Sequence, residues 1–317
     1  MTNISLRQLR YFDALAQSLH FGRAAELCAV TQPALSMQIQ ELEKEIGVML
    51  IERTRAGARL TPEGEEIARR AGSILASIRD LADYARHSAS VLTGRLQLGV
   101  IPTIAPYLLP KLLPQLRAGF PGLDLHLRET QTQYLLDGLV AGRLDALLLA
   151  LPVEHPEVET QVLFEDAFVL ALPAARRLPP DAFASLELFE NDRLLLLEEG
   201  HCLRDQALSF CDLKQVENLD TFGTTSLSTL VQMVANGYGV TLLPRMSLET
   251  EAYRSDVQIL SFAPPEPHRK IGLAWRQSSP RKRDFLELGR IIEQVYAEGQ
   301  MHLHPNARER GAALSLS

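Results

Sequence analysis

The spacing of apolar residues changes at Gly94, and this change limits the folds open to the 317-residue chain. Before Gly94 most apolar residues recur three and four positions apart, as they do on one face of a helix. After Gly94, apolar runs of strand length alternate with segments of helical spacing. The sequence therefore predicts a helical N-terminal part followed by a doubly wound α/β domain that is divided into two lobes.

The first 60 residues are typical of a winged helix-turn-helix unit. One helix begins at Leu6 and a second short helix spans residues 21–30. A third helix is expected to start at Thr31, a good N-cap residue, and to end at Gly47. Two short, closely joined helices form a helix-turn-helix pattern, and the β-leaning runs on either side of residues 56–57 predict a hairpin, or wing.

Polar side chains on the third helix and arginines on the hairpin are the candidates for DNA contact. Leu35, Ile39 and Leu42 should face the core and leave the opposite face polar. Glutamine can read adenine in the major groove, and arginine can hold phosphates, although the arginines could instead form a solvated charge run. The predicted DNA contacts are Thr31, Gln32, Pro33, Ser36, Gln38, Gln40, Arg53, Arg55 and Arg59.

A long helix is predicted from Pro62 onward, and its apolar residues follow a heptad pattern. Such a stripe needs a partner helix, and the simplest partner is the same helix of a second copy; packing within one chain is the alternative. The stripe consists of Ile67, Ala71, Ile74, Ile78, Leu81, Ala85 and Ser88.

Four segments follow from these patterns. Residues 1–61 form the winged helix-turn-helix head, 62–93 the coiled-coil linker helix, 94–298 the two-lobed regulatory domain, and 299–317 a tail that is expected to be disordered. Within the regulatory domain, helices are predicted over 106–120 and 134–141. The predicted strands are 96–101, 123–127, 146–151, 168–172, 194–197, 240–243 and 271–275.

Charge and hydropathy exclude several classes of protein. The formal net charge is −7, and residues 1–94 contribute none of it, which gives slight support to a DNA-facing N-terminal end. No apolar run approaches the roughly 20 residues of a membrane-spanning helix, and no signal peptide is apparent. We therefore expect a cytoplasmic protein without a membrane partner, a metal site or a cofactor.

The chain has three cysteines, which argues against a structural disulfide framework in a cytoplasmic protein. Cys28 is expected in a core. Cys202 follows a predicted buried strand and precedes a segment of helical spacing, so it should lie at a helix N-terminus, where the helix dipole favours the thiolate. His201 and Arg204 should add positive field. Two inert buried thiols are the alternative for Cys202 and Cys211; zinc is disfavoured by their spacing.

The separation of Cys202 and Cys211 predicts a conformational switch. If the segment between them is helical, their Cα atoms lie about 13 Å apart. A disulfide requires at most about 7 Å. Forming the bond must therefore refold the segment, which couples oxidation to a change of shape.

Several segments resemble a known family. FGRAAELCAVTQPALSMQIQELEKEIGVMLIERT, residues 21–54, followed by LTPEG, resembles the DNA-binding head of the LysR-type transcription regulators, and the resemblance extends from residue 6 to about residue 298. The long helix is similar to their dimerising linker, and the remainder to their effector-binding domain. GHCLRDQALSFC at 200–211, IPTIAPYLLP at 101–110, ETQT at 129–132 and PEPHRKIGLAWR at 265–276 resemble the members that sense hydrogen peroxide.

The resemblance implies a redox mechanism. Peroxide would oxidise Cys202 to a sulfenic acid, and Cys211 would then form a disulfide with it. The hydroxyls of Thr103 and Thr132 could instead serve only as helix caps. The implied peroxide-pocket residues are Thr103, Thr132, His201, Asp205 and Arg269.

The resemblance also implies partners. These are promoter DNA, a second copy of the chain in a homodimer or homotetramer, RNA polymerase for an activator, and glutathione with glutaredoxin as reductant. One alternative is a LysR-type regulator that binds a small metabolite between the lobes. Another is an enzyme such as a thiol peroxidase, which we disfavour because a DNA-binding head gives an enzyme no benefit.

Overall fold

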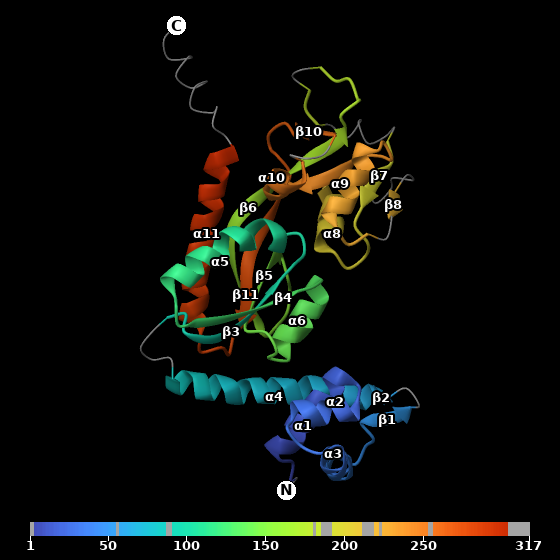
Figure 1. Cartoon of the computed structure of the whole chain (residues 1–317), viewed down its shortest axis with the longest axis vertical. Helices are drawn as coiled ribbons and strands as arrows, with labels where there is room; N and C mark the ends of the chain where they lie inside the picture. Colours follow the sequence, from blue (N-terminus) through green and yellow to red (C-terminus); the bar gives the residue numbers. More distant parts are fainter. Residues whose placement is uncertain are drawn as a thin grey trace. The chain divides into compact units, whose positions relative to one another are not determined.

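The computed structural model describes residues 3–54, 57–86, 91–179, 182–184, 192–210, 219–221, 224–252 and 256–303. The chain divides into two compact units. The first comprises residues 1–89 together with 137–145 and 276–281, and the second comprises 90–136, 146–275 and 282–317. Figure 1 shows the elements of both units.

The N-terminal elements confirm the predicted helices and hairpin. Thr31 occupies the N-cap of the third helix, as predicted, although its side chain makes no capping hydrogen bond. Gly47 ends that helix in the left-handed conformation at φ 86°, as predicted. The elements are α1 (Leu6–Ser18), α2 (Phe21–Leu27), α3 (Gln32–Ile46), β1 (Ile51–Thr54), β2 (Gly57–Leu60) and α4 (Pro62–Arg86).

The LTPEG segment fixes the start of α4 against the two residues that precede β1. The Thr61 hydroxyl accepts a hydrogen bond from the Gly64 N–H at 2.9 Å and donates one to the Met49 carbonyl at 2.8 Å. A Cβ at position 64 would lie 2.1 Å from the Leu50 carbonyl oxygen. Only glycine therefore allows α4 to approach the Leu50 backbone this closely.

The core of the N-terminal elements includes part of the heptad stripe. Ala71 and Leu75 are buried in one cluster with α1 and α3, and Ile67 packs against that cluster. The first part of the stripe is therefore intramolecular core, contrary to a seam that runs its whole length. Farther along α4, Ile74 is 46% exposed and Leu81 is 70% exposed. Ser88 lies outside the described residues, and pairing with a second copy stays a prediction.

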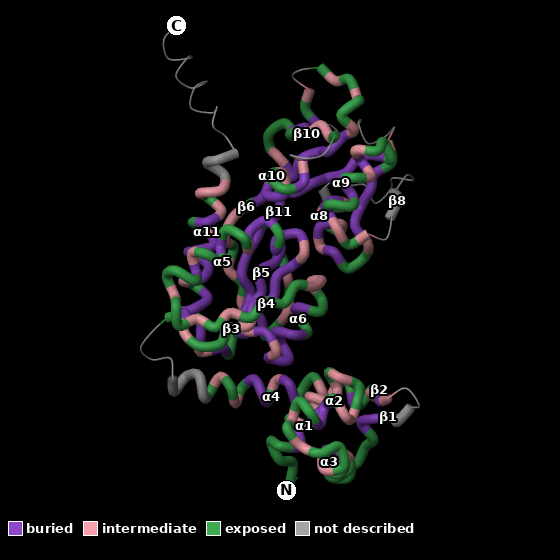
Figure 2. The backbone as a smooth tube through the Cα atoms, viewed as in Figure 1, coloured by how far each residue is buried: buried purple, intermediate pink, exposed green. Residues whose placement is uncertain are grey.

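A mixed sheet forms the centre of the regulatory domain. β3 pairs in parallel with β4 and with β5, and β11 pairs antiparallel with β5. All six residues of β5 are buried, and Figure 2 shows continuous burial along this strand. The bounds are β3 (Gly94–Val100), β4 (Leu123–Glu129), β5 (Ala146–Leu151), β11 (His268–Arg276), α5 (Ala105–Gly119) and α6 (Thr132–Val140).

The second lobe is built on β6, β9 and β10, which belong to the same sheet. β6 pairs antiparallel with β9 and β10, and β7 pairs in parallel with β8. Buried residues of β6, β7, α8, β9 and β10 form its core. Its elements are β6 (Val158–Pro173), β7 (Leu194–Leu196), α8 (Cys202–Phe210), β8 (Leu219–Thr221), α9 (Leu227–Ala235), β9 (Thr241–Pro244), η2 (Arg245–Ser247), α10 (Leu248–Glu251) and β10 (Val257–Ser261).

The C-terminal helix α11 (Lys282–Leu303) packs with α5. Its last turn includes residues 299–303, so the disordered tail cannot begin at residue 299 as predicted. Residues 304–317 of that predicted tail lie outside the described residues. Apolar spacing fades near the end of the helix, and that loss of pattern produced the early boundary.

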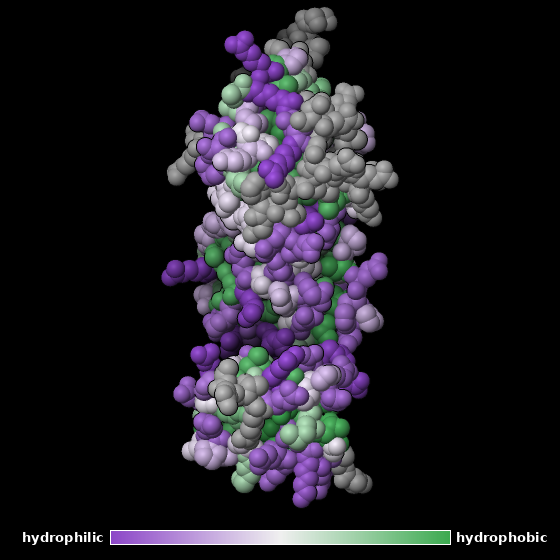
Figure 3. Space-filling view, turned by 90° about the vertical axis from the view of Figure 1, so that its right-hand side faces the viewer, coloured by the Kyte–Doolittle hydropathy of each residue, from purple (hydrophilic) through white to green (hydrophobic). Residues whose placement is uncertain are grey.

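The described surface is predominantly polar on the face seen in Figure 3, with apolar side chains in small separate areas. Among the described helices, none has the length and apolar character needed to cross a membrane. No group of three or more His, Cys, Asp or Glu side chains placed to hold a metal ion occurs among the residues that the structure describes.

Candidate functional site

Cys202 is the first residue of α8, as the sequence predicted. The turn before it is tightly packed, because Gly200 adopts φ 90° and a Cβ there would lie 2.8 Å from Gln131 Oε1. Gln131 comes directly before Thr132, the first residue of α6. The packing of Gly200 on Gln131 therefore brings the beginnings of α6 and α8 together.

The hydroxyl of Thr132 lies beside the thiol. It lowers the pKa of Cys202, yet its Oγ1 atom is buried without a hydrogen bond of ordinary geometry. The Thr132 hydroxyl therefore lies close to the sulfur without forming a hydrogen bond of ordinary geometry. A buried hydroxyl without a partner is unfavourable, and such an atom is poised to bind a small polar molecule.

Arg269 on β11 is held in a buried polar network. Its Nη1 donates to Thr103 Oγ1 at 2.8 Å, and its Nη2 donates to the Thr103 carbonyl at 3.0 Å. Its Nε donates to Asp166 Oδ2 at 3.0 Å. The side chains of Arg269 and Asp166 are both 0% exposed. The network therefore joins β11 to β6 and to the residues just before α5.

Arginine can only donate hydrogen bonds, so the Thr103 hydroxyl is the acceptor in this contact. Its own proton must point elsewhere. Arg269 has five N–H groups, and the bond to Thr103 Oγ1 uses one of the two hydrogens on Nη1. Thr103 and Arg269 thus each retain a donor for a ligand.

The thiol of Cys202 is less acidic than the sequence predicted. Burial raises its pKa, and this effect is larger than the opposing effects of the Arg269 charge, the Thr132 hydroxyl and the Leu203 N–H. The charge of Asp205, which is itself exposed, raises the pKa further. Desolvation of the sulfur therefore outweighs the favourable field in this state.

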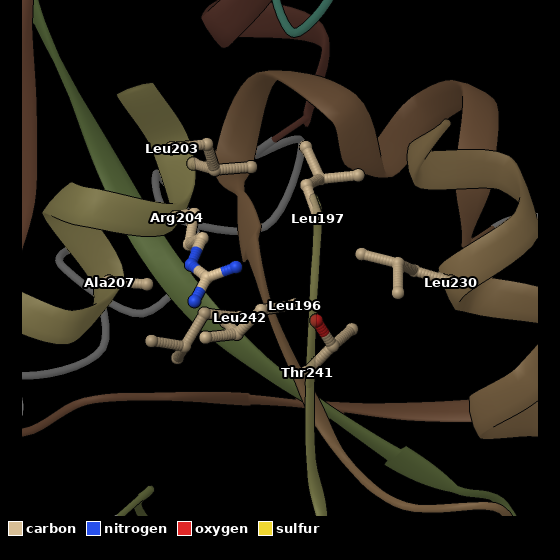
Figure 4. Close-up of a pocket in the computed structure, with 8 residues that line it drawn as sticks. All are labelled: Leu196, Leu197, Leu203, Arg204, Ala207, Leu230, Thr241 and Leu242. Carbon is tan, nitrogen blue, oxygen red and sulfur yellow. The ribbon is translucent and has the colours of Figure 1, made fainter. Parts of the chain in front are cut away.

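Arg204 does not supply the positive field that was expected of it. Figure 4 shows its guanidinium directed into a pocket of the second lobe. Its ion pair with Glu199 is long, at 3.9 Å, and Glu199 is 90% exposed. The positive charge that acts on Cys202 comes from Arg269 instead. The other lining residues are Leu196, Leu197, Leu203, Ala207, Leu230, Thr241 and Leu242.

His201 is buried beside Cys202, and its Nε2 atom has no hydrogen-bond partner in the part of the chain that the structure describes. Burial lowers the pKa of the ring, with Glu198 opposing, so the imidazole is neutral at neutral pH. Of the predicted pocket residues, Thr132, Arg269 and Asp205 act on the thiol, and Thr103 joins them through Arg269. Cys211 lies outside the described residues.

Sequence reasoning missed Asp166. Its Oδ1 accepts from the Met246 N–H at 3.0 Å while Oδ2 binds Arg269. Burial raises the pKa of Asp166, and the charge of Arg269 opposes the rise. An acidic residue directly before the apolar run of residues 167–172 in β6 was the available signal.

A second buried cluster joins the lobes near this network. The Tyr107 hydroxyl of α5 donates to Glu251 Oε1 at 2.8 Å, and the Ser228 hydroxyl donates to the same oxygen at 2.8 Å. Burial and the neighbouring Glu251 raise the pKa of Tyr107. This contact was also absent from the sequence predictions.

The expected DNA-binding face of α3 is partly exposed. Thr31, Gln32, Pro33 and Gln40 are exposed and Ser36 is half-buried, whereas Leu35, Ile39 and Leu42 are buried as predicted. Met37, which the sequence analysis passed over, is 54% exposed beside them. Gln38 is half-buried, and its Nε2 donates to Glu41.

The hairpin places Arg59 opposite Glu52 and Arg53 opposite Ala58. Arg59 is exposed. The side chain of Arg53 and the whole of Arg55 lie outside the described residues. The hairpin itself confirms the predicted wing, while contact with DNA stays a prediction.

Two family models match the chain. The helix-turn-helix model of bacterial regulatory proteins of the lysR family matches residues 6–65. The LysR substrate binding domain model matches residues 89–296, which is more than half of the chain. The chain belongs to the LysR family of bacterial transcription regulators. Its N-terminal unit is therefore a LysR-type DNA-binding head, and the lobes around Cys202 form a LysR-type regulatory domain.

Other LysR proteins resemble this one over almost their whole length. A probable hydrogen peroxide-inducible genes activator of Streptomyces viridosporus is 44% identical, with 92% of this chain and 94% of that protein covered. A full-length OxyR from Pseudomonas aeruginosa with a cysteine-to-aspartate substitution has a TM-score of 0.78 at 39% identity, covering 92% of this chain and 98% of that one. A peroxide-bound cysteine-to-serine variant of Corynebacterium glutamicum OxyR has a TM-score of 0.65 at 33% identity, with 93% of each chain covered.

Proposed function

We propose that this LysR-type regulator senses hydrogen peroxide through Cys202 and changes its contacts with promoter DNA in response. The observation that carries the proposal is the position of Cys202, at the start of an intact helix and among buried polar atoms that lack partners. The similar proteins support the same reading, since one is described as a peroxide-inducible activator and another has peroxide bound.

The groups around the thiol suit one molecule of hydrogen peroxide. Peroxide has two O–H donors and oxygen atoms that accept. Thr132 Oγ1 and His201 Nε2 are buried and unpartnered among the described residues. Thr103 and Arg269 each keep one donor beyond the hydrogen bond that joins them. A metabolite with a larger skeleton would need space as well as donors, whereas peroxide needs only these few polar atoms.

The proposed chemistry has two balanced steps. The Cys202 thiolate attacks one peroxide oxygen, the O–O bond breaks, and the departing hydroxide takes up a proton to become water. The sulfur is oxidised to a sulfenic acid. The Cys211 thiol then attacks that sulfur and releases a second water, leaving a disulfide and a protein lighter by two hydrogen atoms. A hydrogen-bond donor on Arg269 would stabilise the departing hydroxide.

Helix α8 forbids that disulfide while it is intact. Its nine residues place the Phe210 Cα about 12 Å from the Cys202 Cα. Cys211 is one peptide unit farther along, and consecutive Cα atoms are about 3.8 Å apart. A disulfide to the residue after Phe210 would require Cα atoms within about 7 Å, which is closer than one peptide unit beyond the intact helix can reach. Oxidation must therefore unwind part of α8.

The signal would reach DNA through an oligomer. Ile74 and Leu81 are exposed on α4, where a second copy would cover them in a homodimer, and a homotetramer would bind extended operator sites. Gln38 would have to release Glu41 to reach a base. The proposed DNA contacts are Thr31, Gln32, Pro33, Ser36, Gln38, Gln40, Arg53, Arg55 and Arg59.

Two further partners complete the proposal. An activator must contact RNA polymerase once its oxidised form is bound to the promoter. The disulfide must be reduced to reset the sensor, and glutathione with glutaredoxin is the proposed reductant. Asp205, exposed in the first turn of α8, completes the proposed peroxide pocket with Thr103, Thr132, His201 and Arg269.

A promoter footprint tests the function. In the wild-type chain, peroxide should change the footprint, and peptide mapping should find a Cys202–Cys211 link. The Cys202→Ser variant should bind DNA without responding to peroxide. Cys28→Ser is the matched control and should respond normally, because Cys28 packs against the core of the head. A peroxide response that persists in Cys202→Ser would refute the proposal.

A further inference from the structure

Both carboxylate oxygens of Asp166 are engaged, and Arg269 is the member of the proposed pocket that Asp166 binds. Oδ2 accepts from Arg269 Nε at 3.0 Å and lies 3.0 Å from Nη2. Oδ1 accepts from the Met246 N–H at 3.0 Å. The carboxylate therefore binds one edge of the guanidinium and is itself hydrogen-bonded to the backbone of η2.

These contacts with Asp166 determine the orientation of the Arg269 guanidinium. With Nε and Nη2 held by Asp166, the Nη1 end is directed to Thr103. Met246 adds a contact from its Sδ atom, 3.2 Å from Nη2. A buried arginine without its carboxylate would turn toward any other acceptor or negative charge within reach.

We propose that Asp166 is a positioning residue that fixes the guanidinium of Arg269 against Thr103, and so sets the reactivity of Cys202 without touching it. This inference rests on the proposed function, since it concerns the same thiol and the same oxidant. It assigns a role to a residue outside the peroxide pocket that the sequence predicted.

The charges around the two residues support the inference. The groups that act on the Cys202 thiolate are Arg269 from β11, which favours it, and Asp205 from α8, which disfavours it. Asp166 is acted on by Arg269 and by Arg245 of η2, and Arg245 also pairs with Glu266 at 2.9 Å. Among the described residues, Arg269 is thus the one charged group that acts on both the Asp166 carboxylate and the Cys202 thiol. The negative charge of Asp166 offsets part of the positive charge of Arg269, which would otherwise favour the Cys202 thiolate.

Neutralising Asp166 should therefore have two opposite effects. In Asp166→Asn, the guanidinium is free to interact with the thiolate, so the pH midpoint of Cys202 alkylation should move to lower pH. The same variant loses the aligned pair of donors on Thr103 and Arg269. Its peroxide oxidation, measured well above the alkylation midpoint, should slow by about tenfold or more. Greater acidity with slower oxidation is not the signature of simple destabilisation.

The experiment is Cys202-specific alkylation by iodoacetamide as a function of pH, resolved from Cys28 and Cys211 by peptide mass spectrometry. It uses the full-length chain as wild type, Asp166→Asn, Arg269→Gln and the double variant. Asp124→Asn is the matched control, because Asp124 is an exposed carboxylate on β4 whose side chain pairs with His126. Fluorescence of Trp275, the only tryptophan and a buried residue of β11, reports folding.

Asp166→Asn should shift the midpoint when Arg269 is present and leave it unchanged in the Arg269→Gln background. Asp124→Asn should match the wild type. An unchanged midpoint in Asp166→Asn, or an equal shift without Arg269, would overturn the inference. The proposed function fails separately, if peroxide leaves Cys202 of the wild type unoxidised.

A second variant covers the case in which Asp166→Asn does not fold. Asp166→Glu keeps the charge but displaces the carboxylate by one methylene. Its alkylation midpoint should stay near the wild-type value, while its peroxide oxidation should slow because Arg269 and Thr103 are no longer aligned. Wild-type oxidation by Asp166→Glu would show that the position of this carboxylate has no effect, and would overturn the inference.

Discussion

Arg269 Nη1 and Thr103 Oγ1 are joined by a 2.8 Å hydrogen bond between two buried residues, one on β11 and the other just before α5. The bond makes the threonine hydroxyl an acceptor and leaves its own proton free to donate elsewhere. Both members of the pair therefore contribute to the geometry in which a peroxide molecule would be held.

Thr103→Val preserves the shape of the side chain and removes the acceptor. A buried N–H of Arg269 then loses its partner, so the free energy of unfolding should fall by about 1–3 kcal/mol. Peroxide oxidation of Cys202 should slow by about tenfold or more, because a donor to peroxide is lost as well. Urea unfolding and stopped-flow oxidation measure the two effects.

Thr103→Ser is the control for that substitution. It keeps the hydroxyl and should retain most of the oxidation rate. If Thr103→Val oxidises as fast as the wild type, the hydroxyl takes no part in the reaction and serves only the fold.

The pH dependence of oxidation follows from the burial of Cys202, which raises the pKa of its thiol. Only the thiolate reacts, so the oxidation rate should rise about tenfold for each pH unit below that pKa. A rate that is flat across neutral pH would show that the thiol is already ionised, contrary to the burial that the structure records.

Stability should depend on pH through the same group. Because the folded-state pKa is raised above the unfolded value of about 8.5, the folded chain binds the proton more tightly. The contribution of Cys202 to stability is thus fully present below about pH 8.5 and is lost as the pH rises through the folded-state pKa. Urea denaturation of the wild type and of Cys202→Ser should diverge over that alkaline range.

Arg204 provides a test of the second lobe. Its guanidinium lies among leucine side chains and has one long ion pair, so much of its desolvation is uncompensated. Arg204→Met should raise the free energy of unfolding by about 1 kcal/mol and slow disulfide formation, because α8 must unwind first.

Glu199→Gln is the matched control for Arg204. Its carboxylate is 90% exposed, so removing its charge should change stability very little. A loss of stability in Arg204→Met would show that the ion pair matters more than the burial of the charge.

The elements of the head were predictable because their signals are local. Thr31, Pro33 and Gly47 mark the third helix, and the burial of Leu35 and Leu42 follows from their spacing. The position of Cys202 at the start of a helix was predictable for the same reason. Local sequence also suggested that Arg204 would act on the thiol, and this was wrong because its helical position directs it into the second lobe.

The polar network was not predictable from the residues alone. Asp166, Arg269 and Thr103 are far apart in the sequence and meet only through the pairing of strands. The prediction of a lowered pKa for Cys202 was wrong for a related reason. A helix N-terminus is visible in a sequence, whereas desolvation by distant side chains is not. Ala71 fitted the heptad spacing predicted to pair α4 with a second copy, but it is buried in the core of the head. Spacing alone does not show which part of the stripe on α4 packs within the chain.

The DNA-binding face can be tested residue by residue. Arg59→Ala should weaken binding equally on all sequences and reduce the slope of log affinity against log salt by about one, because an exposed arginine of the wing would contact phosphate. Gln40→Ala should instead change the preference at one base pair by about 1–3 kcal/mol. Titrations with operator DNA and with unrelated DNA at several salt concentrations separate the two. A sequence-specific loss in Arg59→Ala would contradict the assignment.

Hydrogen exchange of the α8 amides, before and after one equivalent of peroxide, tests the coupling between sulfur chemistry and shape most directly. In the wild type, protection of residues 203–210 should fall as the link between Cys202 and Cys211 forms, and Cys211→Ser should keep its protection. A complete disulfide in a chain whose α8 remains fully protected would contradict the account.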